Sequence, residues 1–160
     1  MTRYQCISCE ATQITAGIRP DACRHCAGPV FDLDRYEAAI AEAQIIGAQN
    51  DAFRAALGQT EWQGETLRGR VVVTCGIVAR GRDFVDAALD RVRTDASVVD
   101  DHGTDGLRSF GMPDVPHGDE TVRIYWKIDL YDTDGLMGPE QESDPAQTIR
   151  VLTLCLPDEY

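Results

Sequence analysis

The chain has 160 residues, of which 43% are hydrophobic, and it carries a formal net charge of −12. This length allows one ordinary domain, or a small domain followed by one of medium size. The composition suffices for a packed core and argues against global disorder. No apolar run approaches the ~18 residues of a membrane span, and the N-terminus leads directly into a cysteine pair without room for a signal peptide. We therefore expect a cytoplasmic protein with no membrane partner.

The negative charge is unevenly distributed. Residues 94–147 contain 13 acidic and three basic side chains, whereas residues 1–31 are nearly neutral. Nucleic-acid binding is driven by release of cations from phosphates, so this balance argues against DNA or RNA as the ligand of the main domain. Such a stretch is typical of solvated loops. The alternatives are a cation site and mimicry of nucleic-acid charge toward a basic protein partner.

The N-terminal segment contains two C-x-x-C pairs separated by 13 residues: Cys6, Cys9, Cys23 and Cys26. This spacing predicts a structural zinc ribbon, because each tight turn brings two sulfurs to one metal. A redox pair is the rival interpretation, and His25 could replace one cysteine as a ligand. Gly28 is expected to turn the chain with unusual dihedrals. Zinc would supply folding free energy on the order of 10 kcal/mol to this small module.

A helical pattern follows the cysteines. Asp32 or Asp34 is placed to cap it, and apolar residues recur at helical spacing as far as Leu57. Gly47 interrupts the pattern, so we predict either one kinked helix or two helices in series over residues 33–57. Gly58 is a natural stop, and a connecting loop should follow over residues 58–66.

The remaining elements are predicted in chain order. Residues 71–75 should form a strand buried on both faces, with Cys75 in the core, and residues 84–92 an amphipathic helix. An acidic loop over residues 94–119 should lack regular structure through most of its length. Two strands close the chain: 122–131, which alternates apolar and polar residues, and 149–156, an interior strand that buries Cys155.

These elements predict an α+β fold, with a mostly antiparallel sheet, one packed helix and antiparallel pairing of the last two strands. The expected organisation is a zinc ribbon at residues 1–31, a helical linker at 32–58 and an acidic α+β domain at 59–160.

One face of the alternating strand combines aromatic and charged residues: Tyr125, Lys127, Asp129 and Tyr131. The simplest interpretation is a solvated sheet face with a cross-strand ion pair. The functional interpretation is a partner-binding surface, because aromatic residues beside charges are typical interface anchors. A catalytic role would require a desolvated Lys127 that loses its proton near neutral pH.

Two loop histidines, His102 and His117, lie among acidic residues. They could be ordinary surface residues, bind a divalent metal or act as general bases. They carry the alternative function, a metal-dependent enzyme such as a hydrolase.

Several segments from about residue 50 to the C-terminus resemble a known family. They are residues 50–54, 72–76, 125–132 and 144–154, and the final Glu159-Tyr160. On these segments the chain resembles the bacterial domain-of-unknown-function family numbered 3768. The resemblance implies a bacterial protein, often carried on plasmids or other mobile elements, and implies no particular activity.

Together these features predict a zinc-binding acidic interaction protein. Its protein partner would present a basic surface, for example in a host nucleic-acid-binding or defence complex.

Overall fold

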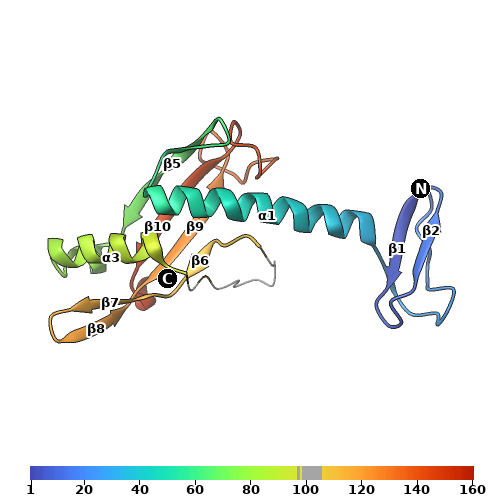
Figure 1. Ribbon diagram of the computed structural model, residues 1–160, viewed down its shortest axis with the longest axis horizontal. Helices are drawn as coiled ribbons and strands as arrows, with labels where there is room; N and C mark the ends of the chain where they lie inside the picture. The colour runs from blue at the N-terminus through green and yellow to red at the C-terminus, as the bar shows by residue number, and fades with distance from the viewer. Residues whose placement is uncertain (97, 99–105) are drawn as a thin grey trace. The chain divides into compact units, whose positions relative to one another are not determined.

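The computed structural model describes residues 1–96, 98 and 106–160 of the 160-residue chain. These residues form two compact units, residues 1–42 and residues 43–160 (Figure 1). Helices and strands both occur and the larger sheet is mostly antiparallel, so the predicted α+β class is confirmed. The predicted three-part division of the chain stays a prediction. Within the described residues, no helix combines the length and apolar character needed to cross a membrane.

The first unit contains a three-stranded antiparallel sheet in the order β2-β1-β3. Strand β1 comprises Thr2–Cys6, β2 comprises Thr12–Thr15 and β3 comprises Val30–Asp32. The buried cluster of this unit consists of Tyr4, Cys6, Cys23 and Val30. Two of its four members are thiols, so apolar burial alone cannot offset the conformational entropy lost on ordering this segment.

Helix α1 is continuous from Leu33 to Ala56, so the alternative of two helices in series is wrong. The predicted cap at Asp32 is confirmed, because its Oδ1 accepts a 2.9 Å hydrogen bond from the Arg35 amide. The helix also ends where predicted, since Gly58 has a φ of 134° and its amide bonds back to the carbonyl of Phe53 at 3.1 Å.

A close backbone contact explains why a glycine occupies position 47 of α1. A Cβ at this buried position would lie 1.9 Å from the carbonyl oxygen of Gly106. The glycine that weakened the helical pattern thus allows a loop of the second unit to approach α1.

The second unit is built on a five-stranded sheet in the order β4-β5-β10-β9-β6. In that order the strands comprise Thr60–Trp62, Glu65–Val73, Ile149–Cys155, Tyr125–Tyr131 and Phe110–Gly111. The predicted interior position of β10 and its antiparallel pairing with β9 are confirmed. Its parallel pairing with β5 was not predicted from the sequence. The expected loop over residues 58–66 is wrong, because those residues form most of the antiparallel β4–β5 hairpin.

The helices supply the core on one side of this sheet. Helix α3, Arg82–Thr94, confirms the predicted amphipathic helix, and a short helix α2, Cys75–Val78, precedes it. Phe53 of α1 and Phe84 of α3 are buried in the same cluster as Trp126 of β9. The alternation predicted for β9 is therefore confirmed, with Trp126 and Ile128 on its core side.

Three further expectations need correction. The strand predicted as buried on both faces exposes 37% of Val72, and Cys75 is exposed at the start of α2. Cys155 is buried as predicted. The expected loop over 94–119 lies partly outside the described residues, and in its second half β6 and β7, Asp114–His117, interrupt it; β7 pairs with β8, Glu120–Arg123. The predicted strand over 122–131 is consequently divided at Ile124 into β8 and β9.

Candidate metal centre and binding face

The structure brings together the four cysteines predicted as metal ligands: Cys6, Cys9, Cys23 and Cys26. Their Sγ atoms all lie within 4.8 Å of one another, and none forms a disulfide. The Cys6–Cys26, Cys9–Cys23 and Cys9–Cys26 sulfur distances are 3.5, 3.7 and 3.5 Å. Tetrahedral zinc with bonds near 2.3 Å places its sulfurs about 3.8 Å apart. The cluster therefore has the dimensions to bind one metal ion.

Both C-x-x-C turns orient their first cysteine through the backbone. The Ser8 amide donates to Cys6 Sγ and the His25 amide donates to Cys23 Sγ, each at 3.4 Å. Such hydrogen bonds stabilise a thiolate, which is the form of cysteine that binds metal. His25 thus contributes its amide to this turn, and the group of converging ligand atoms consists of the cysteine sulfurs.

Gly28 serves a different purpose from the one predicted. The left-handed backbone conformations fall on Glu10 and Ala27, the residues directly after each pair, with φ of 58° and 57°. A Cβ at Gly28 would instead lie 2.7 Å from Ser8 Oγ and 3.2 Å from Cys26 Sγ. This glycine therefore allows the two turns to pack closely.

The electrostatics of the cluster favour a bound cation. Burial raises the pKa of the Cys6 thiol, but the Cys9 and Ser8 amides and neighbouring thiols lower it to about 6. The Ala11 amide lowers the pKa of Cys9, whereas the Cys26 thiol, burial and the other sulfurs raise it to about 12. Ionisation of one thiol in the cluster thus disfavours ionisation of the next. A divalent ion would compensate this repulsion, and four thiolates would leave no coordination position open for catalysis.

The four residues predicted for partner binding share the outer face of β9, opposite the core: Tyr125, Lys127, Asp129 and Tyr131. All four are partly exposed. Lys127 Nζ pairs with Asp129 Oδ2 at 2.9 Å, so the predicted ion pair forms within one strand and not across two. This hydrogen bond raises the pKa of Lys127. A raised pKa is the opposite of the lowered pKa that a catalytic lysine would need at neutral pH.

The C-terminal tyrosine extends this face. The Tyr160 ring lies 5.6 Å from the ring of Tyr125 and 5.4 Å from that of Phe110, and Lys127 Nζ lies 5.8 Å from its centre. The Tyr160 ring, in contact with two other aromatic rings, consequently lies beside the amine of Lys127. Sequence reasoning had noted Tyr160 solely as part of the resemblance, because no local periodicity connects it to β9.

Glu159 fixes the position of this C-terminal segment, which forms the short helix η1, Pro157–Glu159. Its carboxylate accepts hydrogen bonds from Thr74 Oγ1 at 2.6 Å, the Gly76 amide at 2.8 Å and the Leu156 amide at 3.0 Å. The Thr74 hydroxyl, followed by the two amides, lowers the pKa of Glu159. The segment is thereby attached to the turn that follows β5.

The predicted histidine site is not assembled by the described residues. The His117 ring packs edge-to-face on Phe84, with ring centres 4.9 Å apart, and the nearby Asp114 pairs with Arg123 at 2.8 Å. His102 lies outside the described residues. Within residues 1–96, 98 and 106–160, the cysteine cluster is the one group of three or more side chains able to hold a metal. The hydrolase alternative stays a prediction.

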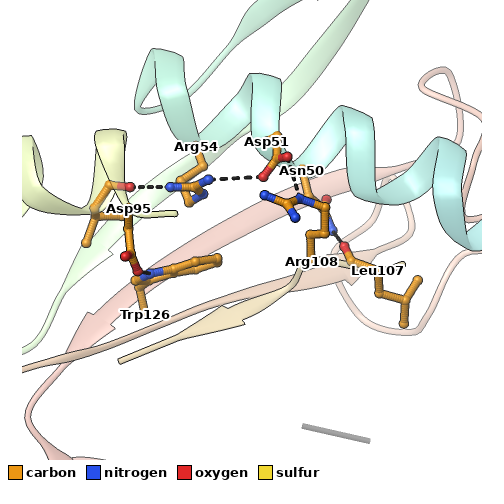
Figure 2. Close-up of polar contacts among 8 residues, drawn as sticks. Asn50, Asp51, Arg54, Asp95, Leu107, Arg108 and Trp126 are labelled. Atoms are coloured by element: carbon orange, nitrogen blue, oxygen red, sulfur yellow. Dashed lines mark hydrogen bonds and ion pairs between the residues drawn. The ribbon is translucent and has the colours of Figure 1, made fainter. Parts of the chain in front are cut away.

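Sequence reasoning also missed a buried polar network between α1 and the sheet (Figure 2). Arg54, which is 5% exposed, donates to the Val92 carbonyl at 2.5 Å and to Asp51 at 3.0 Å. Its guanidinium carbon lies 4.8 Å from the centre of the Trp126 ring. Asp51 also accepts a hydrogen bond of 2.5 Å from Arg108. This network anchors the strand that presents the outer face.

A second buried arginine, Arg150 on β10, extends the network. It is fully buried and donates to the amide oxygens of Asn50 and Gln49 on α1. Asn50 in turn donates to the Leu107 carbonyl at 2.9 Å. The polar residues within an otherwise apolar stretch of α1 were the available signal for these contacts, but spacing alone could not name their partners.

Fold and site together define a two-unit α+β protein in which a four-cysteine cluster able to bind metal precedes a sheet domain. Residues 73–159 match the family described as "Protein of unknown function (DUF3768)", and the match spans more than half of the chain. The chain belongs to this family, as the resemblance implied, and the cysteine cluster lies outside the matched residues. Comparisons with curated proteins and with solved structures find no match.

Proposed function

We propose that this chain is a zinc-binding interaction protein. The observation that carries the metal proposal is the convergence of four free cysteine sulfurs within 4.8 Å in a unit with almost no apolar core. Four thiolates at tetrahedral separation favour zinc over hard cations, which take oxygen ligands. The ion stabilises the first unit, and binding of a protein partner belongs to the second.

The outer face of β9 is the proposed protein-binding surface. Its two tyrosines flank the Lys127–Asp129 ion pair, and aromatic and charged residues in such combinations are typical interface anchors. The rings of Phe110 and Tyr160 restrict Tyr125 before any partner arrives. Prior restriction lowers the entropy lost on binding, which supports this face over more mobile surface residues.

Charge suggests the nature of the partner. The chain carries a net charge of −12, and acidic side chains are exposed at the β7–β8 turn and in the segment after β9: Asp119, Glu120, Asp134, Glu140 and Glu142. A negative field steers a basic protein surface toward the molecule. We propose a cytoplasmic nucleic-acid-binding complex of a bacterial host, such as a defence complex, as the partner. Carriage of the gene on a mobile element, implied by the family resemblance, fits this role.

The lysine content of the chain provides a direct test. Lys127 is the sole lysine, so an amine-acylating reagent can modify two positions, Lys127 and the Met1 amine. The tagged protein is incubated with a low-salt bacterial extract, and acylation before and after capture is quantified by mass spectrometry. We expect captured basic proteins to protect Lys127 while Met1 serves as the internal standard.

The variants make this experiment specific. Tyr125→Ala should reduce capture, whereas Arg93→Ala, an exposed cation on α3, should leave it unchanged. Capture should weaken sharply as salt rises, because a field between exposed charges is screened over about 10 Å at 0.1 M salt. Unchanged capture at high salt, or equal acylation of Lys127 in the free and captured protein, would contradict the proposal.

A further inference from the structure

A groove lies at the Tyr131 end of the sheet, on the side that bears the outer face of β9. Its volume is about 560 Å³, within the roughly 300–1,000 Å³ typical of small-molecule sites. Three strands and the turn after β9 line it, and the residues that matter here are Arg68, Arg70, Tyr131, Asp134, Ile149 and Val151.

Strand register arranges these side chains by chemical type. Arg68 and Arg70, two residues apart on β5, pair with Ile149 and Val151 on β10. Ile149 pairs on its other side with Tyr131 of β9. Residues two apart on a strand point to the same face, so the groove has a basic wall, an apolar floor and an aromatic wall.

The basic wall is unusual in a chain with a net charge of −12. Arg70 is exposed and forms no hydrogen bond or ion pair with any described residue. Arg68 is anchored by one nitrogen, Nη2, which donates to the Ala146 carbonyl at 2.5 Å and to the Pro145 carbonyl at 3.4 Å; its other two nitrogens have no partner among the described residues. Asp134, in the turn, is the one carboxylate in the lining, so the groove has a net charge of +1 from two arginines and one aspartate.

We propose that this groove binds a small organic anion, namely a phosphate or carboxylate group carried on an aromatic ring. The anionic group binds between the two guanidinium groups, whose forked donors match the oxygens of either anion. The ring lies on Ile149 and Val151 beside Tyr131. This ligand site goes beyond the protein-binding role proposed for the outer face, because it assigns a small-molecule function to one end of that sheet surface.

The test uses the full chain and three probes: phenyl phosphate, benzoate and inorganic phosphate. Binding is measured by isothermal titration and by NMR shifts of the Gly69 and Gly135 amides, which line the groove. We expect phenyl phosphate or benzoate to bind with a dissociation constant of about 1 mM or lower, and inorganic phosphate more weakly because it lacks the ring. The stronger of the two ring-bearing probes identifies the anionic group that the site prefers.

Variants at exposed positions distinguish a specific site from general charge. Arg70→Ala should lower the affinity for the preferred probe about tenfold or more, the loss expected for a charge-assisted hydrogen bond. Asp134→Asn should raise this affinity severalfold, because the substitution removes the carboxylate that repels the anion. Arg93→Ala on α3 changes net charge equally and should leave the affinity unchanged. Absence of saturable binding up to about 10 mM of both ring-bearing probes, or equal losses in Arg70→Ala and Arg93→Ala, would overturn the proposal.

Discussion

The buried arginine on α1 offers the sharpest test of how the second unit is stabilised. Arg54 and Arg108 both contact the carboxylate of Asp51 (Figure 2). The side chain of Arg54 is 6% exposed, whereas that of Arg108 is 42% exposed. Replacing each in turn with methionine keeps most of the apolar side-chain volume and removes the charge. The two variants therefore compare one interaction in a buried and in an exposed setting.

The expected magnitude follows from the contacts of Arg54. A hydrogen bond from a charged donor, here to the Val92 carbonyl, contributes about 1.5–3 kcal/mol, and a desolvated cation–π contact with Trp126 about 2 kcal/mol. The Asp51 pair adds less, because that carboxylate keeps Arg108. The substitution also removes the buried Nε of Arg54, which has no hydrogen-bond partner, and this offsets about 1 kcal/mol of the loss. Arg54→Met should thus lower the free energy of unfolding by about 3–4 kcal/mol, a large part of the ~5–15 kcal/mol typical of a domain.

Urea unfolding followed by tryptophan fluorescence measures this difference, because Trp126 is fully buried beside Arg54. With a urea dependence of about 1–3 kcal/mol per molar, Arg54→Met should lower the midpoint by about 1–4 M. Arg108→Met should cost no more than about 1 kcal/mol, as partly exposed ion pairs do. Equal losses in the two variants, or a loss below about 1 kcal/mol for Arg54→Met, would refute the reasoning.

Three further predictions concern the cysteine cluster, the C-terminal segment and α1. Chelation of metal or Cys9→Ser should unfold the first unit while the second keeps its NMR spectrum, because the buried cluster of the first unit consists of four side chains, two of them thiols; a dispersed first-unit spectrum without metal would argue against a structural ion. Glu159 has a lowered pKa, so its hydrogen bonds stabilise the fold above its unfolded pKa of about 4.3 and are lost as pH falls through the lower folded value. The Gly76 amide shift should follow that loss, and Glu159→Gln should abolish the transition; persistence of the transition in the variant would assign it to another group. Gly47→Ala should destabilise by about 1–3 kcal/mol through overpacking against Gly106, although alanine favours helix by about 1 kcal/mol. Its control, Ala48→Gly at an exposed neighbouring site, should cost about 1 kcal/mol. If urea unfolding shows Gly47→Ala to be more stable than the parent, the backbone at Gly106 moves to accommodate the added methyl group, and the overpacking argument is wrong.

Local spacing predicted a large share of the fold. The two C-x-x-C pairs predicted the convergence of the four cysteines, since each turn is a short-range structure whose geometry depends on a few residues. The alternation along β9 predicted which side faces the core, and Gly58 marked the end of α1. Each of these features depends on backbone geometry that repeats within a turn or a strand.

Groups brought together across long sequence separations depended on the tertiary structure alone. Glu159 meets Thr74 across 85 residues, and Arg150 meets Asn50 across 100. Arg68 and Arg70 line a groove with Tyr131 because β10 inserts between their strands and runs parallel to β5. The sequence alone thus determined the cysteine module, the main helices and the core side of β9. Burial of the arginines, exposure of Cys75 and assembly of the groove were decided by strand order, because local periodicity contains no information about which distant segments become neighbours.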